Sequence, residues 1–134
     1  MGKVTKFLLV FGLFLAAVSL SQCSVDGSCY QQMEVPVIRF EMPDSIPLDS
    51  TATIQVVYVT YSPCSKLNNL KVYQQADTLS IHVIADYDGC DCTGVIPDSV
   101  VTYKFVPAAA RNYIFRAWKF DNTILQDTLL VYPN

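Results

Sequence analysis

The sequence is poor in the residues on which most hydrolytic enzymes and nucleic-acid-binding proteins depend. His82 is the only histidine, and 9 basic residues stand against 12 acidic ones in a chain of 134 residues. With one histidine, Ser-His-Asp or Cys-His catalysis would have to use that position. Contacts to a phosphate backbone need a basic surface, which this composition does not supply. We therefore expect no nucleic-acid partner.

Long hydrophobic runs are also missing, with one exception at the N-terminus. Residues 7–20 form an uncharged apolar run after a positively charged start that contains Lys3 and Lys6. The run is shorter than the ~20 apolar residues of a membrane-spanning helix. Its pattern is that of a secretory signal peptide, so we predict that residues 1–22 are removed on export. An uncleaved N-terminal anchor helix is the alternative.

The residues before Cys23 indicate the type of export. Leu20-Ser21-Gln22-Cys23 resembles a lipobox, whose cysteine is diacylated and becomes the new N-terminus, although a small residue is usual where Gln22 stands. Cleavage after Ser21 is the alternative and leaves Cys23 in a secreted protein. Thiols of exported proteins tend to pair, and lipidation of Cys23 removes the odd one of five cysteines. We predict a lipoprotein of the cell envelope, in the outer membrane of a Gram-negative bacterium.

The rest of the chain has room for one domain. We predict a polar, lipidated tether over residues 23–33 and a single domain over residues 34–134. Without the two lysines of the signal peptide, seven basic residues face twelve acidic ones, a net charge of −5. The domain is therefore expected to be globular and acidic.

Short β-strands are expected throughout this domain. Apolar side chains alternate with Ser80, His82 and Asp86 along residues 79–87, the pattern of a strand with one face in the core. Seven short strands with turn signals between them predict an all-β protein, a single immunoglobulin-like or fibronectin-like antiparallel β-sandwich. The other six expected strands cover residues 35–42, 52–61, 70–74, 101–106, 113–120 and 125–132.

Aromatic residues supply the candidates for the core. Tyr113 opens the sixth expected strand after a turn, where such folds often place a tyrosine whose hydroxyl bonds to the backbone of the corner. Trp118, Phe105 and Phe115 are the other core candidates. Half-buried strand positions are expected for six further tyrosines, which would serve as anchors for a glycan or protein partner if exposed: Tyr58, Tyr61, Tyr73, Tyr87, Tyr103 and Tyr132.

The Cys90-Asp91-Cys92 segment, with Cys29 and Cys64, holds the densest group of potential ligands. Zinc sites use separated pairs of Cys or His, which this spacing lacks, so we predict disulfides instead. Cysteines two apart in an extended chain have side chains on the same face, and a bridge between Cys90 and Cys92 would be strained. Each of them must then pair with Cys29 or Cys64, and two connectivities remain open.

An acidic segment precedes these cysteines. Asp86 and Asp88, with Asp91, resemble the first half of a calcium loop, in which carboxylates alternate around a glycine. The distal bidentate glutamate is missing, because Pro97 occupies its position. An acidic turn is therefore the expected role of these three aspartates, and we expect no metal and no cofactor.

Several segments carry a family resemblance. They are Cys64 and residues 86–97, 101–105, 113–118 and 127–131. Together they resemble a group of small lipoproteins of Bacteroidota with an immunoglobulin-like domain. The resemblance implies fold and disulfide markers but no activity. It favours a bridge between Cys64 and Cys92, which leaves Cys29 for Cys90.

Three functional hypotheses follow. The first is a non-enzymatic binding or structural module, attached to the membrane by its lipid, with a protein or glycan partner. The second is a hydrolase or metal-dependent enzyme that uses the acidic, cysteine-rich loop and His82. A concave pocket with His82 beside Asp86 or Asp88 would favour that enzyme. The third is an accessory component of an outer-membrane assembly.

Overall fold

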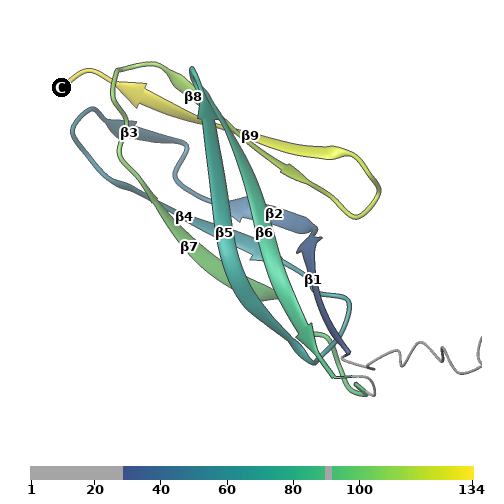
Figure 1. Ribbon diagram of the computed structural model, residues 1–134. Coiled ribbons are helices and arrows are strands. Elements are labelled where there is room, and N and C mark those ends of the chain that lie inside the picture. Colours follow the sequence, from purple (N-terminus) through teal and green to yellow (C-terminus); the bar gives the residue numbers. More distant parts are fainter. Residues whose placement is uncertain (1–28, 90–91) are drawn as a thin grey trace, which may run out of the picture.

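Two β-sheets packed face to face make up the part of the protein that the structure describes (Figure 1). The computed structural model describes residues 29–89 and 92–134, which contain no helix that could span a membrane. The all-β expectation is confirmed. The strands are β1 (Tyr30–Val35), β2 (Val37–Glu41), β3 (Ser45–Pro47), β4 (Ala52–Tyr58), β5 (Ser65–Gln75), β6 (Thr78–Asp88), β7 (Ser99–Phe105), β8 (Asn112–Trp118) and β9 (Ile124–Tyr132).

Strand β6 is the centre of the larger sheet, which contains β1, β3, β5, β6, β8 and β9. Its predicted alternation is confirmed, because Leu79, Ile81, Val83 and Ala85 are all buried. β5 pairs with β6 along nearly its whole length. β1 and β8 share the other edge of β6, where β8 pairs with residues 78–81 and β1 with residues 83–88. The smaller sheet has the order β2-β4-β7.

The structure has two strands beyond the seven expected, β1 and β3, while the expected strand over residues 35–42 corresponds to β2. β1 begins at Tyr30, so residues 30–33 of the expected tether belong to the larger sheet. Their polar side chains are largely exposed, and the segment is held by its pairing with β6. Sequence periodicity does not show such a strand, because no buried face marks it. At Pro36 the chain crosses to the smaller sheet, and the Pro36 carbonyl accepts a hydrogen bond from the Val59 N–H at 3.2 Å.

The expectation of a wholly antiparallel sandwich was wrong for two strand pairs. β6 and β8 are parallel, and so are β3 and β9. Parallel neighbours need a crossover connection. β7 supplies one for β6 and β8, because the chain leaves the larger sheet after β6, forms β7 in the smaller sheet and returns as β8.

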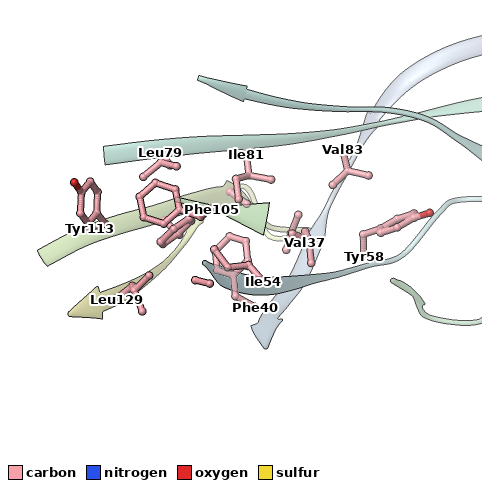
Figure 2. Packing of buried hydrophobic residues seen from close by; sticks show 14 of the residues in the cluster. Val37, Phe40, Ile54, Tyr58, Leu79, Ile81, Val83, Phe105, Tyr113 and Leu129 are labelled. Carbon is pink, nitrogen blue, oxygen red and sulfur yellow. The ribbon is translucent and has the colours of Figure 1, made fainter. Parts of the chain in front are cut away.

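The core lies between the sheets (Figure 2). Phe105 and Phe115 are buried, as predicted. Phe115 of the larger sheet meets Phe105 and Phe40 of the smaller sheet edge to face, with ring centroids 5.5 Å and 6.4 Å apart. Such pairs stabilise the packing beyond the area that they bury. The Phe115 side chain therefore joins three strands across the two layers.

Tyr113 occupies the corner between β7 and β8. Its ring is buried, and its hydroxyl accepts hydrogen bonds from the Ala108 and Ala109 N–H groups at 3.2 Å and 3.1 Å. The same hydroxyl donates to the Ala109 carbonyl at 3.2 Å. The expected bond from this tyrosine to the backbone of the corner is confirmed.

Trp118 was wrongly expected in the core. Side chains alternate along β8, so Tyr113, Phe115 and Ala117 point inward while Trp118 lies on the outer face. The indole is half-buried, and its N–H donates to the Asn122 side-chain oxygen at 3.3 Å. The fluorescence of this single tryptophan therefore reports the outer face of the sheet.

Candidate functional site

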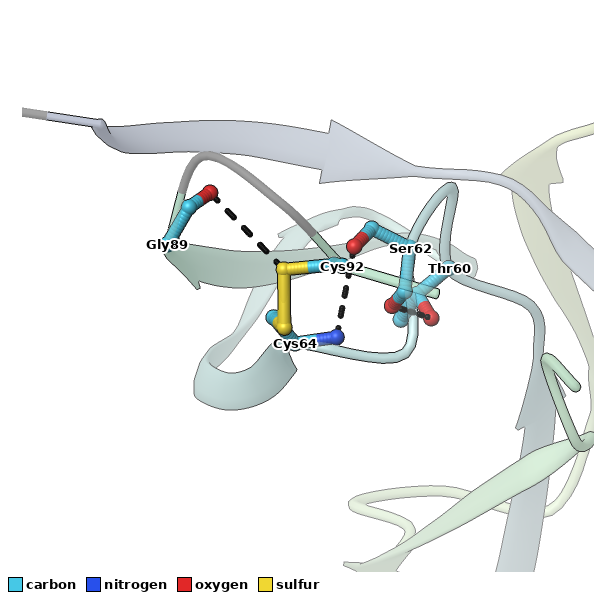
Figure 3. Close-up of a disulfide and its surroundings, with 5 residues drawn as sticks. All are labelled: Thr60, Ser62, Cys64, Gly89 and Cys92. Carbon is cyan, nitrogen blue, oxygen red and sulfur yellow. Dashed lines mark hydrogen bonds between the residues drawn. A yellow bond between two sulfur atoms is a disulfide. The ribbon is translucent and has the colours of Figure 1, made fainter. Parts of the chain in front are cut away.

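A disulfide links Cys64 to Cys92 at one end of the sandwich (Figure 3). The sulfur atoms are 2.04 Å apart, the Cα atoms are 5.7 Å apart, and the two cysteines are separated by 28 positions in the sequence. The pairing that the family resemblance implied is confirmed. The bridge joins the start of β5 to the segment that follows β6.

The loop before Cys64 is fixed by its own hydrogen bonds (Figure 3). The Cys64 N–H donates to the Ser62 hydroxyl at 3.2 Å, and the buried Thr60 hydroxyl donates to the Ser62 carbonyl at 3.1 Å. The Cys64 carbonyl accepts from the Asp88 N–H at 3.3 Å. Cys64 is therefore held in place by hydrogen bonds of both its N–H and its carbonyl.

Gly89 lies against the disulfide in a backbone conformation that would strain any side chain at this position. Its φ of +132° belongs to a region that L-residues rarely adopt, and a Cβ atom would be 3.2 Å from the Cys92 sulfur. The Gly89 N–H donates to the Cys29 carbonyl at 3.1 Å. Cys29 is itself disulfide-bonded. The predicted Cys29–Cys90 pairing and the lipidation of Cys23 stay predictions, because Cys90 and Cys23 lie outside the described residues.

The acidic candidates do not form a metal site in the described part of the chain. The Asp86 carboxylate accepts hydrogen bonds from the side-chain amides of Gln32 at 2.9 Å and Asn68 at 2.7 Å. Asp88 follows at the exposed end of β6, and Asp91 lies outside the described residues. Residues 29–89 and 92–134 contain no cluster of three or more His, Cys, Asp or Glu that could hold a metal ion.

The contacts of Asp86 indicate a structural role across three strands. The amides of Gln32 and Asn68 hold the pKa of Asp86 below its ordinary value, and the hydrogen bond to Asp86 raises the pKa of the Tyr30 hydroxyl. Because the folded-state pKa of Asp86 is the lower one, this stabilisation is present above the unfolded pKa and is lost as the pH falls through the folded value.

His82 is paired with a glutamate rather than with the acidic loop. Its Nδ1 lies 2.8 Å from a Glu34 carboxylate oxygen, and its ring meets Tyr73 edge to face at 5.5 Å. Asp86 is four residues further along β6, roughly 13 Å away. The enzyme hypothesis needed a pocket with His82 beside Asp86 or Asp88, and the structure does not bring these groups together.

A shallow groove of about 520 Å³ opens on the outer face of the larger sheet beside His82. His82 lies between the β6 residues that pair with β8 and those that pair with β1. The groove therefore lies where the strand next to β6 changes from β8 to β1. Ser80, Arg116, Trp118 and Gln126 also line it. Sequence patterns do not reveal this groove, because its residues come from strands whose adjacency depends on the parallel pairing of β6 and β8.

The groove offers hydrogen-bonding groups beside the ring of Trp118. The Arg116 Nε donates to the Gln126 side-chain oxygen at 3.0 Å, which holds the guanidinium along the sheet. Arg116, Ser80 and His82 provide polar atoms, and the half-buried Trp118 provides apolar surface. A few fixed polar groups around apolar surface are typical of small-ligand sites.

Comparison with protein-family models, with curated proteins and with solved structures found no match for this chain. The resemblance to Bacteroidota lipoproteins therefore remains an expectation.

Proposed function

We propose that the chain is an exported, lipid-anchored protein of the cell envelope, in the outer membrane of a Gram-negative bacterium. One observation carries this proposal, the Cys64–Cys92 disulfide. Disulfides persist in oxidising compartments and are rare in the cytosol. The pairing leaves Cys23, Cys29 and Cys90, and a Cys29–Cys90 bridge would leave Cys23 as the odd cysteine. A lipid on its sulfur would account for that residue.

The domain is proposed to be a non-enzymatic binding or structural module with an immunoglobulin-like sandwich. The Tyr113 corner supports the immunoglobulin-like assignment, since such sandwiches often carry a tyrosine in this role. The groove beside His82 and the exposed Tyr73 next to it supply surface for a protein or glycan partner. The six-stranded sheet supplies the rigid support that such a surface needs.

Replacement of the lipid-bearing cysteine tests the proposal. Cys23→Ala should abolish incorporation of a radiolabelled fatty acid in bacteria that express the full chain and should leave the signal peptide uncleaved. Both effects follow because the thioether to the lipid forms on that sulfur. Incorporation is measured on the immunoprecipitated protein.

Ser24→Ala is the matched control, because it changes the neighbouring residue and keeps Cys23. This control should take up label like the wild type. A wild-type chain without label, or one with its mature N-terminus at Gln22, would overturn the proposal.

A further inference from the structure

Exposed aromatic side chains gather at the end of the sandwich that carries the disulfide. Tyr30 is 54% exposed, Tyr61 41% and Phe120 67%. Tyr61 links Phe120 to the sandwich, since its ring lies 5.7 Å from Phe120 and 6.5 Å from the half-buried Tyr87. The Tyr61 N–H donates to the Tyr87 hydroxyl at 3.0 Å, which fixes the loop that presents the ring.

A hollow of about 510 Å³ lies beside Tyr30 and Tyr61. Tyr30, Met33, Tyr61 and Tyr87 line it, and so does Cys29, the first described residue. The chain therefore enters the sandwich beside the exposed aromatic side chains. Figure 1 shows the C-terminus at the opposite end of the molecule.

We propose that Tyr30, Tyr61 and Phe120, the aromatic end of the sandwich, contact the surface of the lipid bilayer. The inference rests on the proposed lipid anchor at Cys23. Cys29 follows Cys23 by six residues, which span at most about 20 Å when fully extended. An acylated Cys23 would thus hold this end of the domain within that distance of the membrane.

The chemistry of the aromatic end fits the headgroup region of a bilayer. Tyrosine rings are amphipathic and are enriched at membrane–water interfaces. The charges nearby are mixed, with Lys119 and Asp121 on either side of Phe120. Attraction to anionic lipids is therefore not the driving force, and the contact should form on zwitterionic phosphatidylcholine and persist at high salt.

Lipid-dependent quenching tests this contact on the protein extracted from bacteria that express the full chain and reconstituted with phosphatidylcholine vesicles. Trp118→Phe removes the native tryptophan, and Phe120→Trp then places a single indole at the aromatic end. Tyr132→Trp in the same background is the matched control at the opposite end, where Tyr132 is 44% exposed. A spin label on the lipid headgroup should quench the indole at position 120 several-fold more than the one at position 132.

Flotation of the vesicles separates the two proposals. Protein that does not float with the vesicles refutes the lipid anchor and this inference with it. Protein that floats but shows equal quenching at positions 120 and 132 refutes the membrane contact alone. A concentration-dependent blue shift at position 120 without lipid would assign the aromatic end to a second copy of the chain. Tyr61→Trp in the Trp118→Phe background is the second reporter if the Phe120→Trp variant does not fold.

Discussion

Replacing Phe115 with alanine is expected to lower the free energy of unfolding by about 3–5 kcal/mol. Phe115 is fully buried and packs edge to face against Phe40 and Phe105 of the other sheet. Truncation removes apolar contacts from both layers and leaves a cavity that strands on either side can fill only in part. Total stabilities of such domains are about 5–15 kcal/mol, so this loss is a large share. Urea unfolding followed by circular dichroism measures it.

Phe120→Ala is the matched control for this truncation. The same atoms are removed from a side chain that is 67% exposed, so the expected change is within about 0.5 kcal/mol. If Phe115→Ala unfolded at the same urea concentration as Phe120→Ala, Phe115 would not join the two sheets as described.

Removal of the Cys64–Cys92 bridge should also lower the stability of the domain by a large amount. In the chain-entropy model a loop that spans 28 positions contributes about 3–4 kcal/mol by restricting the unfolded chain. For a domain of this size the loss corresponds to a melting temperature lower by more than about 10 °C. The Cys64→Ser/Cys92→Ser double variant is preferred, because a single replacement leaves a thiol that can exchange with other disulfides. Thermal unfolding followed by circular dichroism measures the shift.

Ser65→Ala serves as the control, since it alters the neighbour of Cys64 and leaves the bridge intact. It should melt close to the wild type. Non-reducing peptide mapping that found free thiols at Cys64 and Cys92 would contradict the bridge itself. A double variant that melted like the wild type would contradict its stabilising role.

The sequence predicted the features that depend on residues close together along the chain. The alternation in β6 follows from one buried face, and Phe105 and Phe115 are buried as expected. Tyr113 was placed in its corner because it follows a turn at the start of a strand. The Cys64–Cys92 pairing came from the family resemblance, while the spacing of the cysteines alone left two connectivities open.

Non-local pairing accounts for what the sequence did not predict. β1 is held by its ladder to β6 and has no buried face over residues 30–33, so nothing in its pattern marks a strand. The groove beside His82 is lined by residues of β6, β8 and β9, so it depends on the parallel pairing of β6 and β8, which the crossover through the smaller sheet makes possible. For Trp118 the strand period alone gives the observed position, since its spacing of five from the inward-facing Tyr113 places it on the other face of β8.

The intact mass of the protein extracted from bacterial membranes tests the proposed lipid anchor most directly, because one spectrum reports the N-terminus, the lipid and the disulfides. We expect the mass of residues 23–134 with an acylated Cys23, and a gain of four hydrogen atoms on reduction from Cys64–Cys92 and the predicted Cys29–Cys90 bridge. A mass for residues 22–134 without lipid, or for the whole chain from Met1, would contradict the lipid-anchored protein proposed above.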